Sequence, residues 1–366
     1  MKKVSLVSIT ASHYRKRIYL LMERELNCNF IFGVNNSTVK RLDMKLLGNA
    51  IELPNRYLGN SHWYYESGVV KKLSNSDIVI NDLGIFCLSA WKLLLVSKFR
   101  KQKVYNWDHG WYGREGFLKK WVKRAYFGLA EGAFIYGNYA RNLMINNGFN
   151  GEKLHVIHNS LDYDSQLLIR NSLSDTNLYS LHFGNNNPVL CFIGRLTPVK
   201  KLDQVLNALY LLNKNGVFCN LVFIGDGSEL NRLEAQVRAL GLEKQVWFYG
   251  ACYDEEINAQ LMYNADLCVA PGNIGLTAMH AMMFGCPCIS HDDFCWQMPE
   301  FEAIREGKTG CFFKRDDINS LASTISKWLK EKENKRQEVR EACFKEIDEN
   351  WNPHKQIKII KSVIYG

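Results

Sequence analysis

The sequence has no apolar segment long enough to cross a membrane. Its longest apolar run, residues 85–96, is interrupted by Lys92 and falls well short of the roughly 20 residues that a membrane-spanning helix needs. Residues 1–17 lack the apolar length of a secretory signal and instead predict a first β-strand. We therefore expect a cytoplasmic chain that does not span a membrane.

Metal-ligand spacing is also missing. Cys286 and Cys288 lie close together, but no second pair among the 11 cysteines stands at the spacing of a zinc site. Cys191 and Cys268 lie inside apolar, strand-like segments, where the reduced cysteines of cytosolic proteins are usually buried. We expect neither a metal nor another bound cofactor.

Internal repeats of fixed period and long low-complexity tracts are absent as well. The length of 366 residues, with 47% hydrophobic and 12% aromatic residues, is typical of a globular chain of two domains. The net charge of +9 favours an acidic partner, such as nucleotide phosphates, an anionic membrane surface or nucleic acid. No recognisable nucleic-acid-binding module accompanies this charge, so we do not expect a nucleic-acid partner.

Strand-like and helix-like segments alternate along both halves of the chain, which predicts parallel sheets covered by helices on both faces. In the first half we expect strands at residues 4–9, 29–34, 77–82, 103–107 and 154–157, and helices at 15–26, 85–99, 117–129 and 138–147. In the second half we expect strands at residues 189–193, 220–224 and 245–249, and helices at 202–212, 229–240 and 255–262.

Each half is thus predicted to be a Rossmann-like, doubly wound α/β domain. The final helix carries an apolar stripe, including Ile357 and Ile360, that has no place in the second sheet, so we expect it to pack back on the first domain. The expected parts are an N-terminal domain at 1–165, a polar linker at 166–187, a C-terminal domain at 188–349 and the returning helix at 350–366.

Residues 266–289 read DLCVAPGNIGLTAMHAMMFGCPCI, the order of a strand, a loop, a helix and a second strand. Pro271 breaks the apolar strand, and Gly285 stands where a left-handed helix cap is usual. The helix therefore begins at the loop, and its first N–H groups can bind an anionic ligand beyond the strand. The residues expected to border this ligand are Gly272, Asn273, Ile274, Gly275 and Leu276.

A second candidate site follows the apolar segment 189–193. Gly194 allows a tight turn, Arg195 comes next, and Lys200 stands just before the next helix. Fixed cations near a helix N-terminus can bind a diphosphate together with backbone N–H groups. A cluster of surface cations without function is disfavoured there by the helix dipole. We therefore expect Arg195 and Lys200 to bind a diphosphate.

Two further loops follow predicted strands and are expected at the same edge of the sheet. Gly225 opens a Gly-Asp-Gly turn, which is weak evidence because a purely structural turn needs the same residues. Tyr249 and Gly250 end the next strand, where their backbone can border a nucleotide base. We include these three residues among the expected ligand-binding residues.

These segments together resemble the retaining GT-B glycosyltransferases of family four, which use nucleotide-sugar donors. The resemblance covers essentially the whole second domain in the family's order and spacing, and the first domain matches more loosely. It is carried by FIGRLTPVKKLDQVLNAL, VFIGDGSEL, VWFYGACYDEEINAQLMYNADLCVAPG, GLTAMHAMMFGCPCI and PEFEAIREGKTG, and in the first domain by VYNWDHG and HVIHNSLD. It implies the GT-B fold, in which two Rossmann-like domains face a cleft.

The resemblance implies that Arg195 and Lys200 hold the donor diphosphate and stabilise the departing nucleotide. Positive charge on that leaving group then takes the role that a divalent metal has in other transferases. His109, after a first-domain strand, is implied to contact the donor sugar. A lone histidine is also often structural.

The sequence departs from the family at two positions. The family usually carries two glutamates eight positions apart, one touching the donor sugar and one the ribose. Aligned on Gly275 and Leu276, these positions hold Gly272 and His280. His280 can bind a ribose hydroxyl or pack in the core, and Asn273 can offer its amide to a sugar hydroxyl. The identity of the donor stays open.

In the family, the region after the next strand closes over the donor sugar. Here it contains His291 and, a little later, Glu300 and Glu302. Because loop carboxylates are usually solvated, we rank these residues below Arg195 and Lys200.

The acceptor side is less clear. Residues 117–127 interleave lysine and arginine with aromatic side chains, and Arg15-Lys16-Arg17 forms a second basic cluster. A basic helix with aromatics can lie on an anionic membrane, which would make the protein peripheral at the inner membrane face. An amphipathic helix with its aromatics in the core explains the same pattern.

The sequence predicts a glycosyltransferase that moves a sugar, with retention, to a hydroxyl of a glycan or lipid-linked glycan. By analogy with the family, we expect a role in polysaccharide or lipopolysaccharide assembly. One alternative is a nucleotide-sugar epimerase of the same fold, because the missing glutamates can signal changed chemistry. Another is a catalytically degenerate glycan-binding or partner subunit. The sequence leaves the base, sugar, acceptor and oligomeric state open.

Overall fold

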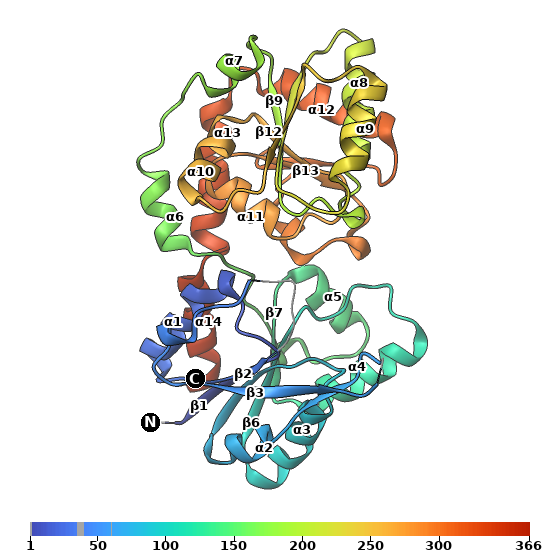
Figure 1. The fold of residues 1–366 in the computed structure, drawn as a ribbon. Coiled ribbons are helices and arrows are strands. Elements are labelled where there is room, and N and C mark those ends of the chain that lie inside the picture. Colours follow the sequence, from blue (N-terminus) through green and yellow to red (C-terminus); the bar gives the residue numbers. More distant parts are fainter. Residues whose placement is uncertain (1, 35–39, 60) are drawn as a thin grey trace. The chain divides into compact units, whose positions relative to one another are not determined.

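We describe a computed structural model of the chain, which covers residues 2–34, 40–59 and 61–366. The chain divides into two compact units (Figure 1). Unit 1 consists of the residues up to Tyr163 together with Asn352–Gly366, and unit 2 consists of Asp164–Trp351. Unit 1 is therefore built from two stretches of chain, whereas unit 2 is continuous.

Unit 1 contains, within the described residues, an 8-stranded sheet of order β4-β3-β2-β1-β5-β6-β7-β8. The paired strands run parallel except at the edge, where β4 is antiparallel to β3. The strands are β1 (Val4–Ser8), β2 (Asn29–Val34), β3 (Ala50–Tyr57), β4 (Tyr64–Glu66), β5 (Ile78–Asp82), β6 (Lys103–Asp108), β7 (Gly132–Ile135) and β8 (Leu154–Val156). The helices are α1 (Lys16–Leu26), α2 (Val69–Lys72), α3 (Leu88–Arg100), α4 (Phe117–Leu129), α5 (Asn138–Asn146) and α14 (Pro353–Tyr365), with short 3-10 turns between them.

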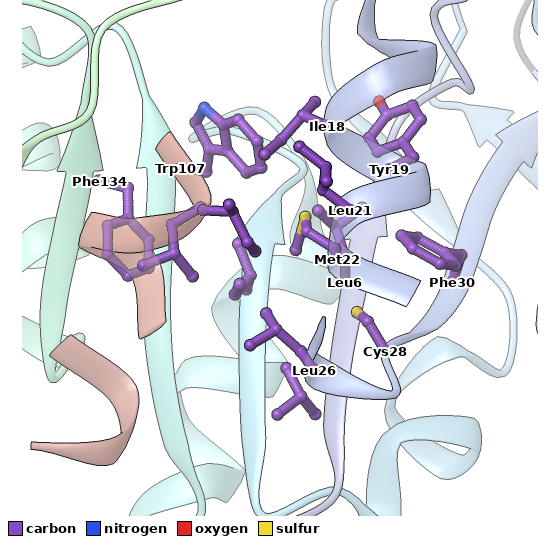
Figure 2. Close-up of a cluster of buried hydrophobic side chains, with 14 of the residues drawn as sticks. Leu6, Ile18, Tyr19, Leu21, Met22, Leu26, Cys28, Phe30, Trp107 and Phe134 are labelled. Atoms are coloured by element: carbon purple, nitrogen blue, oxygen red, sulfur yellow. The ribbon is translucent and has the colours of Figure 1, made fainter. Parts of the chain in front are cut away.

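Helix α1 forms the centre of one face of unit 1. Ile18, Leu21 and Met22 recur at helical spacing and are buried, and Asn27 ends the helix in the left-handed conformation (φ 48°). Figure 2 shows these side chains pointing toward the strands, with Trp107 and Phe134 in the same cluster. Burial of this stripe, not helix propensity, is what fixes α1 on the sheet.

Helix α14 completes the same face. Asn352 caps it by accepting a hydrogen bond from Lys355 N (2.9 Å), and Pro353 occupies the first turn, where its missing N–H costs nothing. Ile357 and Ile360 lie in the same buried cluster as α1, and α14 packs against α1. The expectation that the last helix returns to the first domain is confirmed.

Unit 2 contains, within the part of the chain described, a 6-stranded parallel sheet of order β11-β10-β9-β12-β13-β14. The strands are β9 (Val189–Ile193), β10 (Asn220–Ile224), β11 (Val246–Gly250), β12 (Leu267–Ala270), β13 (Cys288–His291) and β14 (Gly310–Phe313). The helices are α6 (Tyr163–Arg170), α7 (Leu178–Phe183), α8 (Asp203–Lys214), α9 (Leu230–Leu240), α10 (Glu255–Asn264), α11 (Leu276–Met283), α12 (Ile318–Lys332) and α13 (Arg336–Asn350), with 3-10 turns η5 (Pro198–Lys200), η6 (Phe294–Trp296) and η7 (Pro299–Ala303).

The expected linker at 166–187 is wrong. This stretch carries most of α6 and all of α7 and belongs to unit 2. Gln166 and Tyr179 are buried, and Tyr179 donates a hydrogen bond to Leu261 O of α10 (2.7 Å). Polar groups of this stretch also bind the rest of unit 2, as in the ion pair of Arg170 with Asp348 and the bond from Thr176 N to Asn264 Oδ1, and polar contacts of this kind leave no apolar pattern in the sequence.

Three strands of unit 1, β3, β4 and β7, were not anticipated from the sequence, and β4 has only 3 residues. β3 contains Pro54 and is exposed along most of its length, so it lacks the apolar pattern of an inner strand. β7 is buried but has only 4 residues, too few for a periodic signal. All three belong to the same α/β sheet, and β4 adds an antiparallel edge to the parallel sheet that was expected.

Replacing Ile360 by Ala is expected to destabilise unit 1 by about 2–5 kcal/mol, since it removes a fully buried side chain from between α14 and the sheet. Urea unfolding followed by circular dichroism measures this loss. The exposed neighbour Lys358 provides the control, because Lys358→Ala should change stability by less than about 0.5 kcal/mol. Equal stability of the two variants would contradict the assignment of α14 to the core.

Candidate functional site

In unit 2 the order in which strands are added to the sheet reverses between β9 and β12. From β9 the chain adds β10 and β11 on one side, and then returns to place β12 on the other side of β9. The loops that follow β9 and β12 therefore leave the sheet in opposite directions. In open parallel sheets ligands bind at the carboxyl ends of strands where the order reverses in this way. Arg195, Lys200 and Gly272 all lie in these two loops.

Lys200 joins the two loops. Its ammonium group donates hydrogen bonds to the backbone oxygen of Asn273 (2.7 Å) and to Asn273 Oδ1 (2.8 Å). In return, Gly272 N donates to the backbone oxygen of Lys200 (3.0 Å). The predicted proximity of Lys200 to the loop at 271–275 is thus present in the structure.

Lys200 has an unusual electrostatic environment for a cation. Burial lowers its pKa from the ordinary value to about 8, while the charge of Glu300 raises it and that of Arg195 lowers it further. Arg195 is exposed, and its charge acts on Lys200, so the two cations lie in one electrostatic environment. An anion bound beside them would relieve both the repulsion and the desolvation of Lys200.

Gly272 is required by the closeness of the two loops. A Cβ atom at this position would lie 2.1 Å from the backbone oxygen of Val199 and 2.7 Å from Lys200 Cα, which no ordinary side chain tolerates. The resemblance aligns Gly272 with a glutamate of family four. A glutamate cannot occupy this position unless the loop moves away from Lys200.

The loop at 271–275 is supported from beneath by two residues that were not anticipated. Gln297 Oε1 accepts a hydrogen bond from Ile274 N (2.9 Å), and its Nε2 donates to Ser290 Oγ (2.7 Å). Ser290 Oγ in turn donates to Ala270 O (2.8 Å). Ile274 N is thus already bonded within the protein, and whether Ile274 borders a ligand stays a prediction. Helix α11 begins next, with Gly275 (φ 51°) preceding Leu276.

The predicted loops after β10 and β11 pack at the same carboxyl edge of the sheet in unit 2. A Cβ atom on Gly225 would lie 1.9 Å from Gly194 O, so the turns after β9 and β10 touch through their backbones. Gly225 N donates to Gly250 O (2.8 Å), which brings the end of β11 beside them. Tyr249 and Gly250 are partly exposed there. Whether these backbones border a nucleotide base stays a prediction.

His280 is paired with a carboxylate of a neighbouring helix. It lies on the second turn of α11, and its Nε2 is 2.9 Å from Glu255 Oε1 at the start of α10. Gln166 Nε2 donates to the same oxygen (2.6 Å). The imidazole is 19% exposed and the Glu255 side chain 34% exposed. The sequence provided no signal for this pair, because Glu255 and His280 lie on different helices.

The three candidate residues after β13 differ in burial and in the charges that they face. His291 is buried, accepts a hydrogen bond from Asp293 N (3.2 Å), and has its pKa lowered to about 4, first by burial and then by the charge of Arg315. Glu300 is 2% exposed and acts electrostatically on Lys200, so its expected solvation is wrong. Glu302 is partly exposed, and its charge acts on Arg305.

His109 belongs to unit 1. It follows β6, and its ring makes edge contact with Tyr136 (centroids 4.9 Å apart) and stacks near Tyr112 (6.1 Å). Asp108 accepts a hydrogen bond from Gly110 N (2.8 Å), which fixes the turn that carries His109. Its implied contact with a donor sugar stays a prediction.

Arg15 is not part of a free basic cluster. Its guanidinium is buried, bonds Asp82 Oδ2 (2.5 Å) and Tyr136 OH, and lies over the ring of Trp107. Ser8 Oγ donates to the same Asp82 oxygen (2.7 Å). The charge of Arg15 is therefore neutralised inside unit 1.

One cavity of unit 2 lies away from the predicted site. It has a volume of about 840 Å³, lies between α8 and α12, and is lined by Leu211, Asn215, Lys327 and their neighbours. Residues 2–34, 40–59 and 61–366 contain no group of three or more His, Cys, Asp or Glu side chains arranged to hold a metal ion.

Known proteins resemble the chain in sequence and in structure. The family described as Glycosyl transferases group 1 matches residues 176–346. A lipopolysaccharide 1,6-galactosyltransferase of Salmonella typhimurium is 23% identical over 318 residues, which is 83% of this chain and 80% of that protein. Glycogen synthase 2 of Nitrosococcus oceani is 28% identical over 167 residues, so the match covers only 33% of that enzyme's length and 43% of this chain.

The solved structure of Anabaena HepE in complex with UDP superimposes with a TM-score of 0.76 at 18% identity, covering 100% of both chains. This likeness shows the fold, which is the two-domain α/β fold of the GT-B type expected from the sequence. The match to the group 1 glycosyltransferases covers residues 176–346, which make up most of unit 2.

Proposed function

We propose that the chain transfers a sugar from a nucleotide diphosphate-sugar to a hydroxyl of a glycan or lipid-linked glycan, with retention at the anomeric carbon. Unit 2 binds the donor, and unit 1 binds the acceptor. The observation that carries this proposal is the pair of cations, Arg195 and Lys200, in the loop after β9 next to the loop that starts α11. A diphosphate is the common anion that fits two cations and a helix start.

In the proposed reaction the bond between the anomeric carbon and the diphosphate oxygen breaks, the acceptor hydroxyl oxygen forms a new bond to the same carbon, and the hydroxyl proton passes to the departing diphosphate. Negative charge grows on the departing nucleotide diphosphate. Arg195, Lys200 and the first N–H groups of α11 stabilise this charge, and the electrostatic gain is large where water is excluded. His109 of unit 1 contacts the donor sugar. No metal ion is required in this scheme.

The relatives support a choice of donor and pathway to test first. The structural neighbour HepE is described in complex with UDP, and one sequence relative is described as a lipopolysaccharide galactosyltransferase. We therefore propose a UDP-sugar as donor, and polysaccharide or lipopolysaccharide assembly as the pathway.

A nucleotide-sugar epimerase is the second candidate. It is favoured by one observation, that Gly272 and His280 stand where family four has its two glutamates. An epimerase changes a UDP-sugar without an acceptor, whereas a transferase releases UDP only as product of transfer or slow hydrolysis.

The donor class is tested by thermal stabilisation with UDP-, GDP- and ADP-sugars, followed by product analysis. We expect one nucleotide to raise the unfolding temperature, because a ligand that binds only the folded state stabilises it. Incubation of that donor alone should leave the sugar unchanged, and addition of a glycan acceptor should yield a product of the same anomeric configuration by NMR. A new sugar epimer without acceptor would establish the epimerase, and no binding of any nucleotide would indicate a degenerate subunit.

Arg195→Ala and Lys200→Ala are each expected to weaken binding of UDP by about 1.5–3 kcal/mol, the range for hydrogen bonds to charged groups. Isothermal titration calorimetry measures this change. Lys201→Ala is the matched control, because Lys201 pairs with Asp316 instead of facing the loop at 271–275. Unchanged affinity in both site variants would remove the diphosphate assignment.

The pH dependence distinguishes the two cations. The pKa of Lys200 is about 8 in the free protein, and a bound diphosphate favours the charged form, so UDP should bind progressively more weakly as pH rises above 8. The dissociation constant should rise by up to about tenfold between pH 7 and pH 9 in the wild type and in Arg195→Ala. Lys200→Ala should lose this dependence. A dependence that persists in Lys200→Ala would assign it to another group.

We also propose that unit 1 associates with an anionic membrane surface. Helices α3 and α4 adjoin each other and contain no Asp or Glu. Phe99 is 90%, Phe117 79% and Leu118 77% exposed. Lys92, Lys98, Arg100, Lys119, Lys120 and Arg124 supply positive charge on the same two helices.

The basic helix predicted at 117–127 has some aromatic side chains in the core and others on the surface. Tyr126 and Phe127 are buried in the core, and Lys123 is buried against Glu115 (2.8 Å), so these residues are structural. Phe117 and Trp121 remain exposed. Exposed aromatics beside cations are typical of proteins that lie on anionic lipid. No described helix is both long and apolar enough to cross a membrane.

Charge reversal of Lys119 and Lys120 to Glu should lower binding to vesicles of phosphatidylcholine and phosphatidylserine by at least about tenfold, because each cation contributes about 1 kcal/mol near such a surface. Vesicle flotation measures the bound fraction. The control reverses Lys244 and Lys308, two exposed lysines of unit 2, and changes the net charge equally. Equal losses in both variants, or equal binding to vesicles without phosphatidylserine, would contradict the proposal.

A further inference from the structure

Unit 1 has a cavity at the sheet edge opposite to the one where His109 lies. Its volume is about 270 Å³, and Gly132 and Leu154 are among the residues that line it. β7 begins at Gly132 and β8 at Leu154, and both strands run parallel to β6 in the sheet. The cavity therefore lies at the amino edge of these strands, whereas His109 follows β6 at the carboxyl edge. The proposed sugar transfer gives this cavity no role.

Most of the side chains that line this cavity are apolar. Phe127, near the end of α4, is 6% exposed, and its ring meets the half-buried ring of Phe149 edge to face (centroids 6.2 Å apart). Ala130, Ala133 and Leu154 line the cavity beside them. Transfer of an alkyl group from water to such a lining is favourable, because it removes apolar surface from water.

Three glycines also line the cavity, and one of them has no steric reason to be glycine. A Cβ atom on Gly132 would lie 2.9 Å from Lys153 O, and one on Gly148 would lie 3.1 Å from Arg124 Nη2. A Cβ atom on Gly128 would meet nothing within 4 Å outside its own helix. Glycine inside a helix lowers stability, so its presence at 128 is unexplained by packing within the protein. It leaves the space beside α4 open.

Two exposed cations, Arg124 and Lys153, border the same cavity. Arg124 Nη1 donates a hydrogen bond to Asn147 O (3.0 Å), and the guanidinium has further N–H donors for a ligand. Within the described part of the chain neither cation forms an ion pair. Glu131 and Glu152 adjoin lining residues in the sequence, but no Asp or Glu is among the described residues that line the cavity. The cavity thus joins an apolar lining to positive charge.

A stripe of exposed residues on α4 leads to this cavity. Phe117, Trp121, Arg124 and Gly128 are spaced four, three and four residues apart, so they lie on one face of the helix. Phe117 is 79% and Trp121 59% exposed, and their rings meet edge to face (centroids 6.2 Å apart). The last two members of the stripe line the cavity. Helix α4 (Figure 1) is one of the two helices that we propose to lie on an anionic membrane.

We propose that this cavity binds a single anionic phospholipid, with an alkyl chain against the apolar lining and the phosphate beside Arg124 and Lys153. An amphiphile uses both features, whereas free phosphate leaves the apolar lining empty and a neutral lipid leaves the cations unpaired. The inference rests on the proposed association with an anionic membrane, which supplies the lipid. It goes further, because diffuse attraction to a charged surface needs no cavity. A lipid held here fixes which side of unit 1 faces the membrane.

The probe is dihexanoyl phosphatidylglycerol, kept below its critical micelle concentration so that single molecules are titrated into the full chain in a calorimeter. We expect it to bind at least about tenfold more tightly than dihexanoyl phosphatidylcholine, whose headgroup has no net charge, because two cations face the phosphate. Inorganic phosphate, which has no alkyl chain, should also bind at least about tenfold more weakly. Equal affinity for the two lipids, or for phosphate and phosphatidylglycerol, would overturn the inference.

Filling the cavity from α4 tests its place. Gly128→Leu adds a side chain where the structure has open space, so the protein should fold normally, as circular dichroism can verify, and bind the probe at least about tenfold more weakly. Ala125→Leu is the matched control, because Ala125 is exposed on the same helix and does not line the cavity. It should bind the probe within about twofold of the wild type. Equal affinity of the two variants would contradict the assignment.

Removing the two cations tests the headgroup contact. The double variant Arg124→Gln with Lys153→Gln should weaken binding of dihexanoyl phosphatidylglycerol by at least about tenfold and should bind phosphatidylcholine as the wild type does. Lys244→Gln with Lys308→Gln removes the same charge from exposed positions of unit 2 and should change neither affinity. Equal losses in the two double variants would overturn the inference. If the wild type binds phosphatidylserine vesicles but not the short-chain lipid, the cavity is wrongly assigned although the proposed surface association stands.

Discussion

An ammonium group held largely out of water determines the form of unit 2's candidate site. Burial of a lysine is unfavourable unless acceptors surround the charge, and Asn273 provides two of them. These acceptors are neutral, so the charge of Lys200 is solvated but not cancelled by them. For Asn273 to reach it, the loop must come so close that only glycine fits at position 272. Any larger side chain at position 272 would collide with the backbone of Val199 and Lys200.

Unit 1 uses its buried cation in the opposite way. Arg15 bonds the carboxylate of Asp82 and the hydroxyl of Tyr136, and Trp107 covers it. A buried ion pair of this kind contributes specificity of packing more than net charge, because its field is largely cancelled at a distance. Tyr136 also contacts His109, so the pair helps to define the position of that ring. Arg15 thus contacts a carboxylate directly, whereas Lys200 is bonded by neutral acceptors while the charge of Glu300 raises its pKa.

The sequence predicted well those features that depend on local pattern. The helix predicted at 202–212 is observed as α8 (Asp203–Lys214), and the strand predicted at 189–193 is β9. Gly285 follows α11 with a positive φ (78°), as its place before Pro287 indicated. Features that depend on contacts between distant segments were not accessible. Gln297 supports a loop 23 residues earlier in the chain, and Glu255 meets His280 across two helices. No periodicity records such contacts. The burial of Glu300 was missed for the same reason.

The order of segments along the chain has a consequence for synthesis. Proteins are made from the N-terminus, and domains usually fold as they emerge. Unit 2 is continuous and has all its residues once Trp351 has been added, whereas the apolar face formed by α1 lacks α14 until after that point. The first unit to begin is therefore the last to be completed. Until α14 arrives, its sheet presents an uncovered apolar surface, and a nascent chain halted before Pro353 should be a target for chaperones.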